Sequence, residues 1–121
     1  MSCRLEYEAT LGVRACYNPE RIEFALDDGD ESYFDEWWAD KENLTLSFNG
    51  GMYANDLELY LRELLRVFRR IAPFIEDDED VYVLNTDASW PTGWRYVFKD
   101  GDVKCYEGMM IFVEEVTNSL V

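Results

Sequence analysis

Residues 55–72 carry the strongest periodic pattern in the sequence, and the rest of the chain has to pack against the element that it predicts. Apolar side chains recur there at spacings of three and four residues, which lines one face of an α-helix: Leu57, Leu61, Leu64, Phe68 and Ile71. Asn55 suits the N-cap, Arg69 and Arg70 complement the negative end of the helix dipole, and Pro73 ends the helix. We expect this helix to pack across a sheet.

The first part of the chain shows the alternation of a strand. Residues 5–17 place apolar side chains on odd positions and mostly polar ones on even positions, which predicts a strand with one buried face. A turn at 18–20 and renewed alternation in 21–26 predict a second strand, so that the two form an antiparallel hairpin. The inward positions of the second strand would be Ile22, Phe24 and Leu26.

Further strands are predicted after this hairpin. Residues 44–48 alternate and end at the glycines 50 and 51, and residues 81–84 are β-branched and aromatic. The clearest hairpin joins 94–98 to 103–106 through Asp100-Gly101, since this dipeptide supplies the positive φ values of a tight turn.

Two segments stay open at this level. Residues 33–40 suit either a short helix or an irregular aromatic flap, and residues 109–113 suit a strand or a short helix. Taken together, the patterns predict an α+β fold, an antiparallel sheet of about five to six strands with one main amphipathic helix (55–72) packed on one face. A single domain over residues 1–121 is expected from the length.

The net charge argues against some classes of binding partner. The chain has 26 Asp and Glu residues against 11 Lys and Arg residues, a formal net charge of −15. A polyanion repels phosphate, so neither nucleic acid nor an anionic membrane is expected as a direct partner. With no long apolar run and no signal peptide pattern, the expected location is the cytoplasm. Cys3, Cys16 and Cys105 lack CxxC spacing and are expected to be free thiols there.

The residue types disfavour an enzyme. Histidine is absent, which excludes Ser-His and Cys-His catalysis and removes the commonest metal ligand. No glycine-rich phosphate loop is present, and no cofactor is expected. A catalytic carboxylate pair of the glycosidase kind is kept as the least favoured alternative. Any two of the 26 acids can face each other, but no pattern in the sequence marks such a pair. The acidic segment 27–31 lacks the EF-hand order, so a solvated loop is favoured there over a calcium site.

Charged and aromatic clusters leave alternatives between structural and binding roles. Four arginines fall at helical spacing: Arg62, Arg66, Arg69 and Arg70. The favoured interpretation pairs them with the chain's own acids, such as Glu58, Glu63 or the 76–80 run, and the alternative is an anion or partner site. Trp94 begins an alternating strand and is expected in the core. For three other tryptophans, core and interface stay equally open: Trp37, Trp38 and Trp90.

The distribution of the acids suggests a function. Residues 20–58 hold twelve acids against two basic residues, and residues 76–80 are five acids in succession. We predict a small acidic protein-binding module, an inhibitor or nucleic-acid mimic that occupies a basic surface of a nucleic-acid-binding protein. Phage-encoded inhibitors of restriction or CRISPR effectors, and immunity proteins of nuclease toxins, offer an analogy of charge and size alone.

The residues expected to meet the partner come from both acidic segments: Asp27, Asp28, Asp30, Glu31, Asp35, Glu36, Trp37, Trp38, Asp40, Glu76, Asp77, Asp78 and Glu79. The alternative is a structural or housekeeping domain whose acidity reflects salt adaptation, in which the acids spread over the whole surface. A homodimer is compatible with either reading.

Overall fold

The computed structural model describes residues 3–27, 29–86 and 92–108. Its strands are β1 (Cys3–Gly12), β2 (Glu36–Asp40), β3 (Thr45–Ala54), β4 (Glu79–Asn85), β5 (Thr92–Lys99) and β6 (Asp102–Gly108). The long helix is α1 (Leu57–Ile71), and three short 3-10 helices are η1 (Pro19–Ala25), η2 (Asp30–Tyr33) and η3 (Ala72–Phe74). The element predicted at 109–113 and the loop tip with Trp90 lie outside the described residues.

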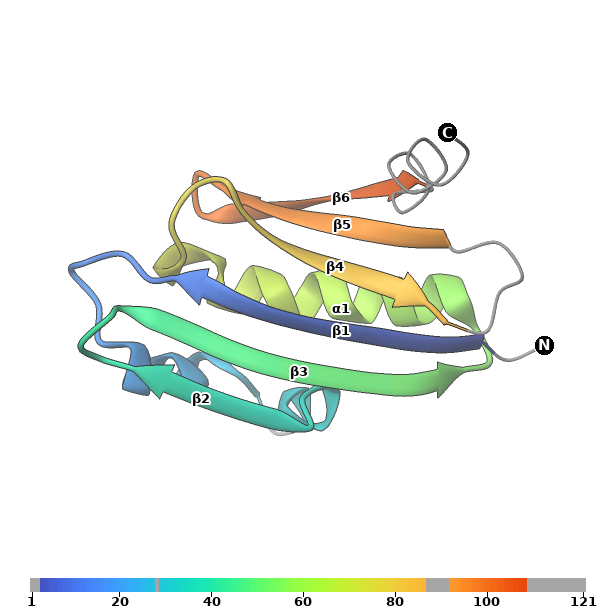
Figure 1. The fold of residues 1–121 in the computed structure, drawn as a ribbon, viewed down its shortest axis with the longest axis horizontal. Helices are drawn as coiled ribbons and strands as arrows, with labels where there is room; N and C mark the ends of the chain where they lie inside the picture. The colour runs from blue at the N-terminus through green and yellow to red at the C-terminus, as the bar shows by residue number, and fades with distance from the viewer. Residues whose placement is uncertain (1–2, 28, 87–91, 109–121) are drawn as a thin grey trace, which may run out of the picture.

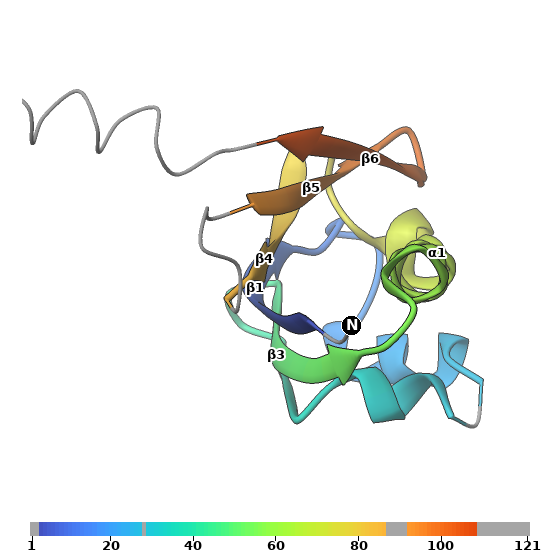
Figure 2. The same ribbon diagram turned by 90° about the vertical axis from the view of Figure 1, so that its right-hand side faces the viewer.

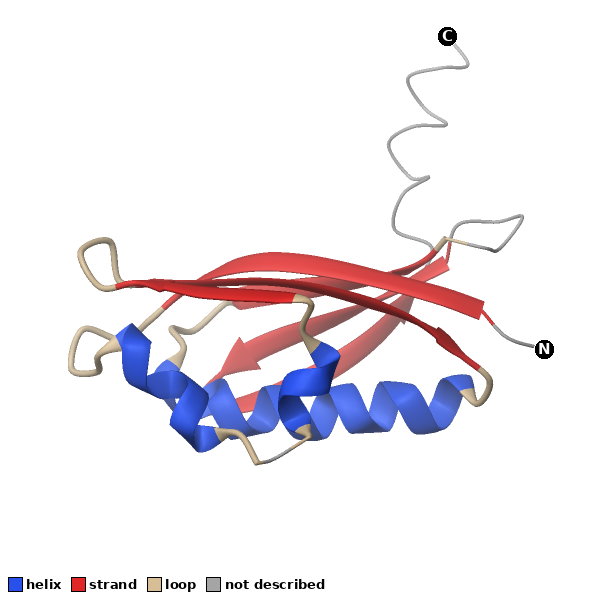
Figure 3. Ribbon diagram, turned by 90° about the horizontal axis from the view of Figure 1, so that it is seen from below, coloured by secondary structure: helices blue, strands red, loops and turns tan. Residues whose placement is uncertain are grey.

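The six strands form one sheet in the order β2-β3-β1-β4-β5-β6, and each strand is antiparallel to its neighbours (Figure 1). β1 lies in the middle, between β3 and β4, and α1 connects these two flanking strands. Figure 3 shows the helices together on one side of the sheet. Figure 2 views α1 along its axis and shows that it lies against the central strands. The predicted α+β fold with one main helix on an antiparallel sheet is confirmed.

The core lies between α1 and the sheet face that it covers. Leu5 and Leu11 of β1 are fully buried there, as the alternation predicted, and they meet the apolar face of α1, where Leu64 and Phe68 are also fully buried. Trp94 of β5 is 6 % exposed and belongs to the same cluster, so its predicted place in the core is confirmed. Side chains of this size each contribute roughly 1.5–3 kcal/mol on burial, which makes this interface the main source of stability.

The hairpin predicted for residues 5–26 is wrong. β1 ends at Gly12 and pairs with β3 and β4, and residues 19–25 form η1 instead of a second strand. The Asn18 side chain accepts a hydrogen bond from the Glu20 N–H, and Pro19 occupies the first helical turn, so this turn begins a helix. As a result Ile22 is buried while Phe24, predicted inward, is 76 % exposed.

Two boundaries also differ from the sequence reading. Residues 36–40 form the edge strand β2, which is neither the short helix nor the irregular flap considered for 33–40. β3 continues through the glycines to Ala54, because both glycines face β1 in regular register. The helix is confirmed, although its N-cap is Asp56, whose carboxylate accepts from the Leu59 N–H at 3.1 Å.

The hairpin between β5 and β6 forms as predicted. Its two turn residues, Asp100 and Gly101, have φ values of 53° and 75°. Both values lie in the left-handed region, which matches the tight turn that an Asp-Gly pair favours.

A close approach at Gly50 joins β3, β1 and η2. The Tyr7 hydroxyl donates to the carbonyl oxygen of Tyr33 and lies 3.1 Å from the Tyr60 hydroxyl. Burial, reinforced by the hydrogen bond with Tyr60, raises the pKa of Tyr7, so the phenol stays protonated. A Cβ atom at Gly50 would lie 2.6 Å from the Tyr7 ring and closer still to the Tyr33 carbonyl oxygen.

Gly50→Ala is therefore expected to lower the free energy of unfolding by about 1–3 kcal/mol, because the added methyl group overpacks this contact. Urea unfolding followed by tryptophan fluorescence measures the change. Gly108→Ala is the control, since a Cβ there meets no atom within 4 Å and should change stability by less than about 0.5 kcal/mol. Equal effects of the two substitutions would contradict the assigned contact.

Candidate functional site

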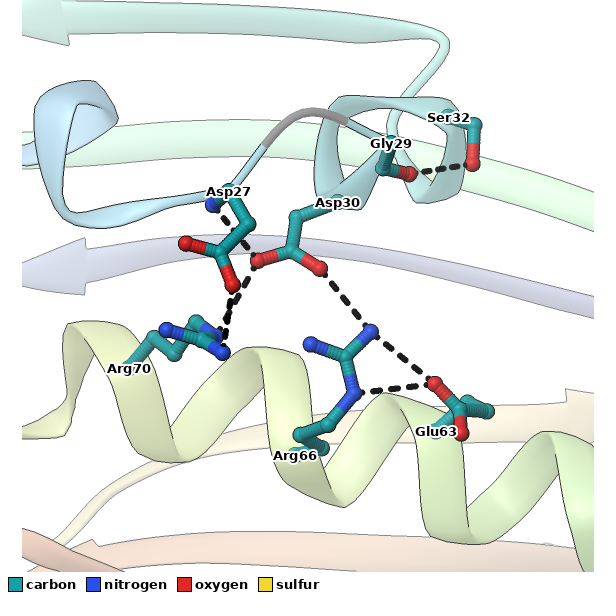
Figure 4. A network of polar contacts seen from close by, with 7 residues as sticks. All are labelled: Asp27, Gly29, Asp30, Ser32, Glu63, Arg66 and Arg70. Atoms are coloured by element: carbon teal, nitrogen blue, oxygen red, sulfur yellow. Dashed lines mark hydrogen bonds and ion pairs between the residues drawn. The ribbon is translucent and has the colours of Figure 1, made fainter.

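Two arginines of α1 hold the acidic segment between η1 and η2. Asp30 is only 2 % exposed, and its carboxylate lies 2.9 Å from Arg66 Nη2 and 3.2 Å from Arg70 Nε (Figure 4). The Asp27 N–H also donates to this carboxylate at 2.8 Å, and the Asp27 side chain lies 2.6 Å from Arg70 Nη2. The solvated loop predicted for 27–31 is therefore wrong for Asp30, which is buried against the helix, whereas Asp27 stays exposed while it pairs with Arg70.

The other helix arginines are also paired. Arg62 lies 2.9 Å from Glu58, and Arg69 lies 2.9 Å from Asp102. Arg66 contacts Glu63 at 2.9 Å, and this contact, followed by that with Asp30, raises the pKa of Arg66. The prediction of internal pairing is confirmed, with Glu58 and Glu63 as foreseen.

The acidic run at 76–80 pairs with other cations. Asp77 accepts from the backbone N–H of Asp100 and from Arg14, and these contacts lower its pKa. Glu79 accepts from the Gly12 N–H at 2.6 Å, and Asp80 lies 2.8 Å from Arg95. Part of this run therefore joins β1, β4 and the β5–β6 turn at one end of the sheet.

The remaining residues that were predicted to bind a partner lie in different parts of the fold. Asp40 accepts from the N–H groups of Glu42 and Asn43 in the β2–β3 turn, which lowers its pKa, the bond from Asn43 contributing most. Glu76 and Asp78 are exposed at the start of β4. Asp28 lies outside the described residues. Members of both acidic segments are therefore already tied to internal partners.

The two adjacent tryptophans face opposite sides of the sheet. Trp37 stacks on Phe48 at 5.8 Å and meets the edge of Phe34 at 4.8 Å, so it closes the core beside β2. Trp38 is 50 % exposed on the face that no described helix covers. The alternative left open by the sequence resolves toward the core for Trp37 and toward the surface for Trp38.

Five exposed carboxylates gather around β2, and we name them the β2-edge acids: Glu8, Glu23, Glu31, Asp35 and Glu36. Among the described residues none of these carboxylates has an ion-pair or hydrogen-bond partner. Glu36 and Glu8 both stand opposite Asn49 of β3, so they flank it on the uncovered face.

Two hollows meet at this edge, and Asp35 lines both of them. The first, of about 260 Å³, lies on the side of η1 and η2 and is lined by Glu23, Leu26, Glu31, Phe34, Asp35 and Trp37. The second, of about 520 Å³, lies across β3, β1 and β4, where Gly50 and Gly51 leave space and Glu8 lines the wall. The acids and apolar walls of the first hollow suit a cationic side chain that has an aliphatic stem, whereas Arg4 lines the second.

Sequence reasoning found part of this site. Glu31, Asp35 and Glu36 were predicted and are brought together, whereas Glu8 and Glu23 were missed. The outward position of Glu8 was visible in the alternation of 5–17, but its nearness to β2 depends on pairing with β3. Glu23 was hidden because its segment matched a strand.

We expect Asp30→Asn to lower the free energy of unfolding by about 1–3 kcal/mol, because two half-exposed arginines lose their buried partner charge. Glu31→Gln is the matched control, since this neighbouring carboxylate is exposed and unpaired and should change stability by less than about 0.5 kcal/mol. Thermal and urea unfolding of both variants provide the comparison. An Asp30→Asn variant with an unchanged free energy of unfolding would contradict a structural role for these ion pairs.

None of the helices in the described ranges combines the length and apolar composition needed to span a membrane. Within the same ranges, no group of three or more acidic, cysteine or histidine side chains is arranged to hold a metal ion. Comparisons with protein-family models, with curated proteins and with solved structures found no match. Any functional assignment therefore rests on the geometry and charge of the β2 edge.

Proposed function

We propose that this chain is an acidic protein-binding module that docks through its β2 edge onto a basic surface of a nucleic-acid-binding protein and so blocks that surface. The observation that carries the proposal is the absence of internal partners for the β2-edge acids within the described part of the chain. Every arginine except Arg21 already has an ion-pair partner within the described part of the chain, including all four on α1.

The acidic residues that the structure describes therefore fall into two groups, those with an internal ion-pair partner and those without one. Asp30 is buried against α1, and Asp27, although exposed, is already paired with Arg70. The β2-edge acids are exposed and unpaired among the described residues, and carboxylates placed in this way can take the places of phosphates before Lys and Arg side chains. A field of one sign also speeds the encounter with a cationic partner.

Aromatic side chains at the edge support a binding role. Trp38 is half exposed beside Glu36, and Trp37 and Phe34 line the smaller hollow. Tryptophan beside charge is typical of the residues that dominate protein interfaces, and arginine stacks well on its ring. The site therefore offers both charge and apolar contact area.

The proposal assigns no catalytic step and no cofactor to these residues. We place its action in the cytoplasm, in an inhibitor of the anti-restriction, anti-CRISPR or immunity kind. Cys16 and Cys105 are free and exposed, which suits a reducing compartment.

Salt adaptation is the second candidate, and one observation favours it. Exposed acids without ion pairs also lie away from β2, among them Glu76, Asp78, Asp100 and Glu107. If these acids matter as much as the β2-edge acids, the charge acts through its total and not through a site.

A pair of charge-matched variants tests the proposal. The edge variant carries Glu23→Gln, Glu31→Gln, Asp35→Asn and Glu36→Gln, and the control variant carries Glu76→Gln, Asp78→Asn, Asp100→Asn and Glu107→Gln. Both remove four negative charges. Immobilised wild type, edge variant and control variant are exposed to lysate of the native host, and retained proteins are identified and then titrated as purified proteins by calorimetry.

We expect wild type and control to retain the same basic nucleic-acid-binding protein, and the edge variant to bind it at least about tenfold more weakly with a flatter salt dependence. Equal losses in both variants would assign the effect to net charge. Unchanged binding by the edge variant would refute the site.

A further inference from the structure

β2 is an edge strand, and no other strand of the described residues pairs with its outer side. It lies at the end of the strand order, and Figure 3, which views the molecule from the β2 side, shows the helices below the sheet and not beside this strand. An edge strand presents N–H and C=O groups that another extended chain can pair with. The β2 edge therefore offers backbone hydrogen bonds in addition to charge.

The backbone contacts agree with this. Among the described residues, β2 pairs with β3 alone, and no backbone hydrogen bond joins residues 36–40 to any other segment. In an antiparallel pair, alternate residues direct their N–H and C=O groups away from the partner strand. Some of the N–H and C=O groups of these five residues therefore point outward.

We propose that the partner contributes an extended basic segment that adds to the sheet as a further strand alongside β2. This inference rests on the proposed function and specifies how the partner is held. Hydrogen bonds to the β2 backbone would give affinity, and alternate side chains of the added strand would give specificity.

The acidic side chains around β2 favour a basic segment as the added strand. Glu36 and Asp40 lie on the same face of β2, four residues apart, so basic side chains at alternate positions of an added strand would pass close to both. On the other face, the hollow walled by Phe34 and Trp37 has Glu31 at its rim and accepts a side chain with an aliphatic stem. A basic strand is therefore matched on both faces.

The same charges disfavour the other occupants. Antiparallel pairing of β2 with a second copy, centred on Trp38, would place Glu36 of each chain opposite Asp40 of the other, which is repulsive. Residues 109–121 contain no Lys or Arg. The opposite sheet edge, β6, carries Lys104 beside Asp102 and Glu107, so it offers a basic strand less negative charge than β2, which has two acids and no base.

The test uses a fluorescein-labelled heptapeptide of alternating arginine and valine, and two isomers of it. One isomer is N-methylated at the valines and the other at the arginines, so all three peptides have the same side chains and charge. Only alternate N–H groups of an added strand face β2. We therefore expect one isomer to bind about as well as the parent and the other at least about tenfold more weakly, measured by fluorescence anisotropy.

Other results overturn the inference in distinguishable ways. Equal affinities of the three peptides would mean that charge alone holds them, which removes strand addition and leaves the proposed function intact. No binding of the parent peptide would remove an extended basic segment as the occupant, while the charge-matched variants above still decide the proposed function.

A charge reversal and hydrogen exchange locate the binding edge. We expect Glu36→Lys to weaken binding of the parent peptide about tenfold, and Glu107→Lys, its control on β6 at the opposite edge of the sheet, to change the affinity less than twofold. The outward amides of β2, which do not donate to β3, should gain protection when the peptide binds, and the amides of β6 should not. Protection of these outward amides in the free chain, or a dimer in sedimentation that the peptide dissociates, would show another occupant and overturn the proposal.

Discussion

The ion pairs between Asp30 and the arginines of α1 are the constraint on which the edge of this molecule depends. They fix the segment between η1 and η2 against the helix, and this segment leads directly into β2. Because Asp30 is nearly fully buried, its charge is screened less than that of a surface acid, and the two guanidinium groups satisfy it. The position of β2 follows from this attachment as well as from its pairing with β3.

The parts of the fold that the sequence predicted have strong local patterns. The helix at 57–71 and the β5–β6 hairpin follow from apolar spacing and from Asp-Gly turn chemistry, which act over a few residues. The prediction for residues 21–26 was wrong because their alternation is typical of a strand, whereas capping by Asn18 and the fixed φ of Pro19 favour a helix. β2 was missed because a five-residue edge strand gains its order from β3 and from the core contact of Trp37.

The candidate site was predictable to the same limited extent. A cluster of acids in sequence indicated where negative charge would lie, and Glu31, Asp35 and Glu36 are found together. Sequence spacing cannot show which acids meet an arginine some forty residues away, so Asp27 and Asp30 looked the same as Glu31. Internal pairing therefore decides which carboxylates are available for binding, and that pairing is a property of the tertiary structure.

The central place of β1 has a consequence for biosynthesis. Its two neighbours, β3 and β4, are at residues 45–54 and 79–85, so most of the chain must leave the ribosome before β1 has both partners. Long-range pairings of this kind slow folding and leave an unpaired strand exposed to aggregation. Glu6 and Glu8 on β1 repel a like strand from another nascent chain, so the acidity that shapes the finished surface also protects the polypeptide while it is being made.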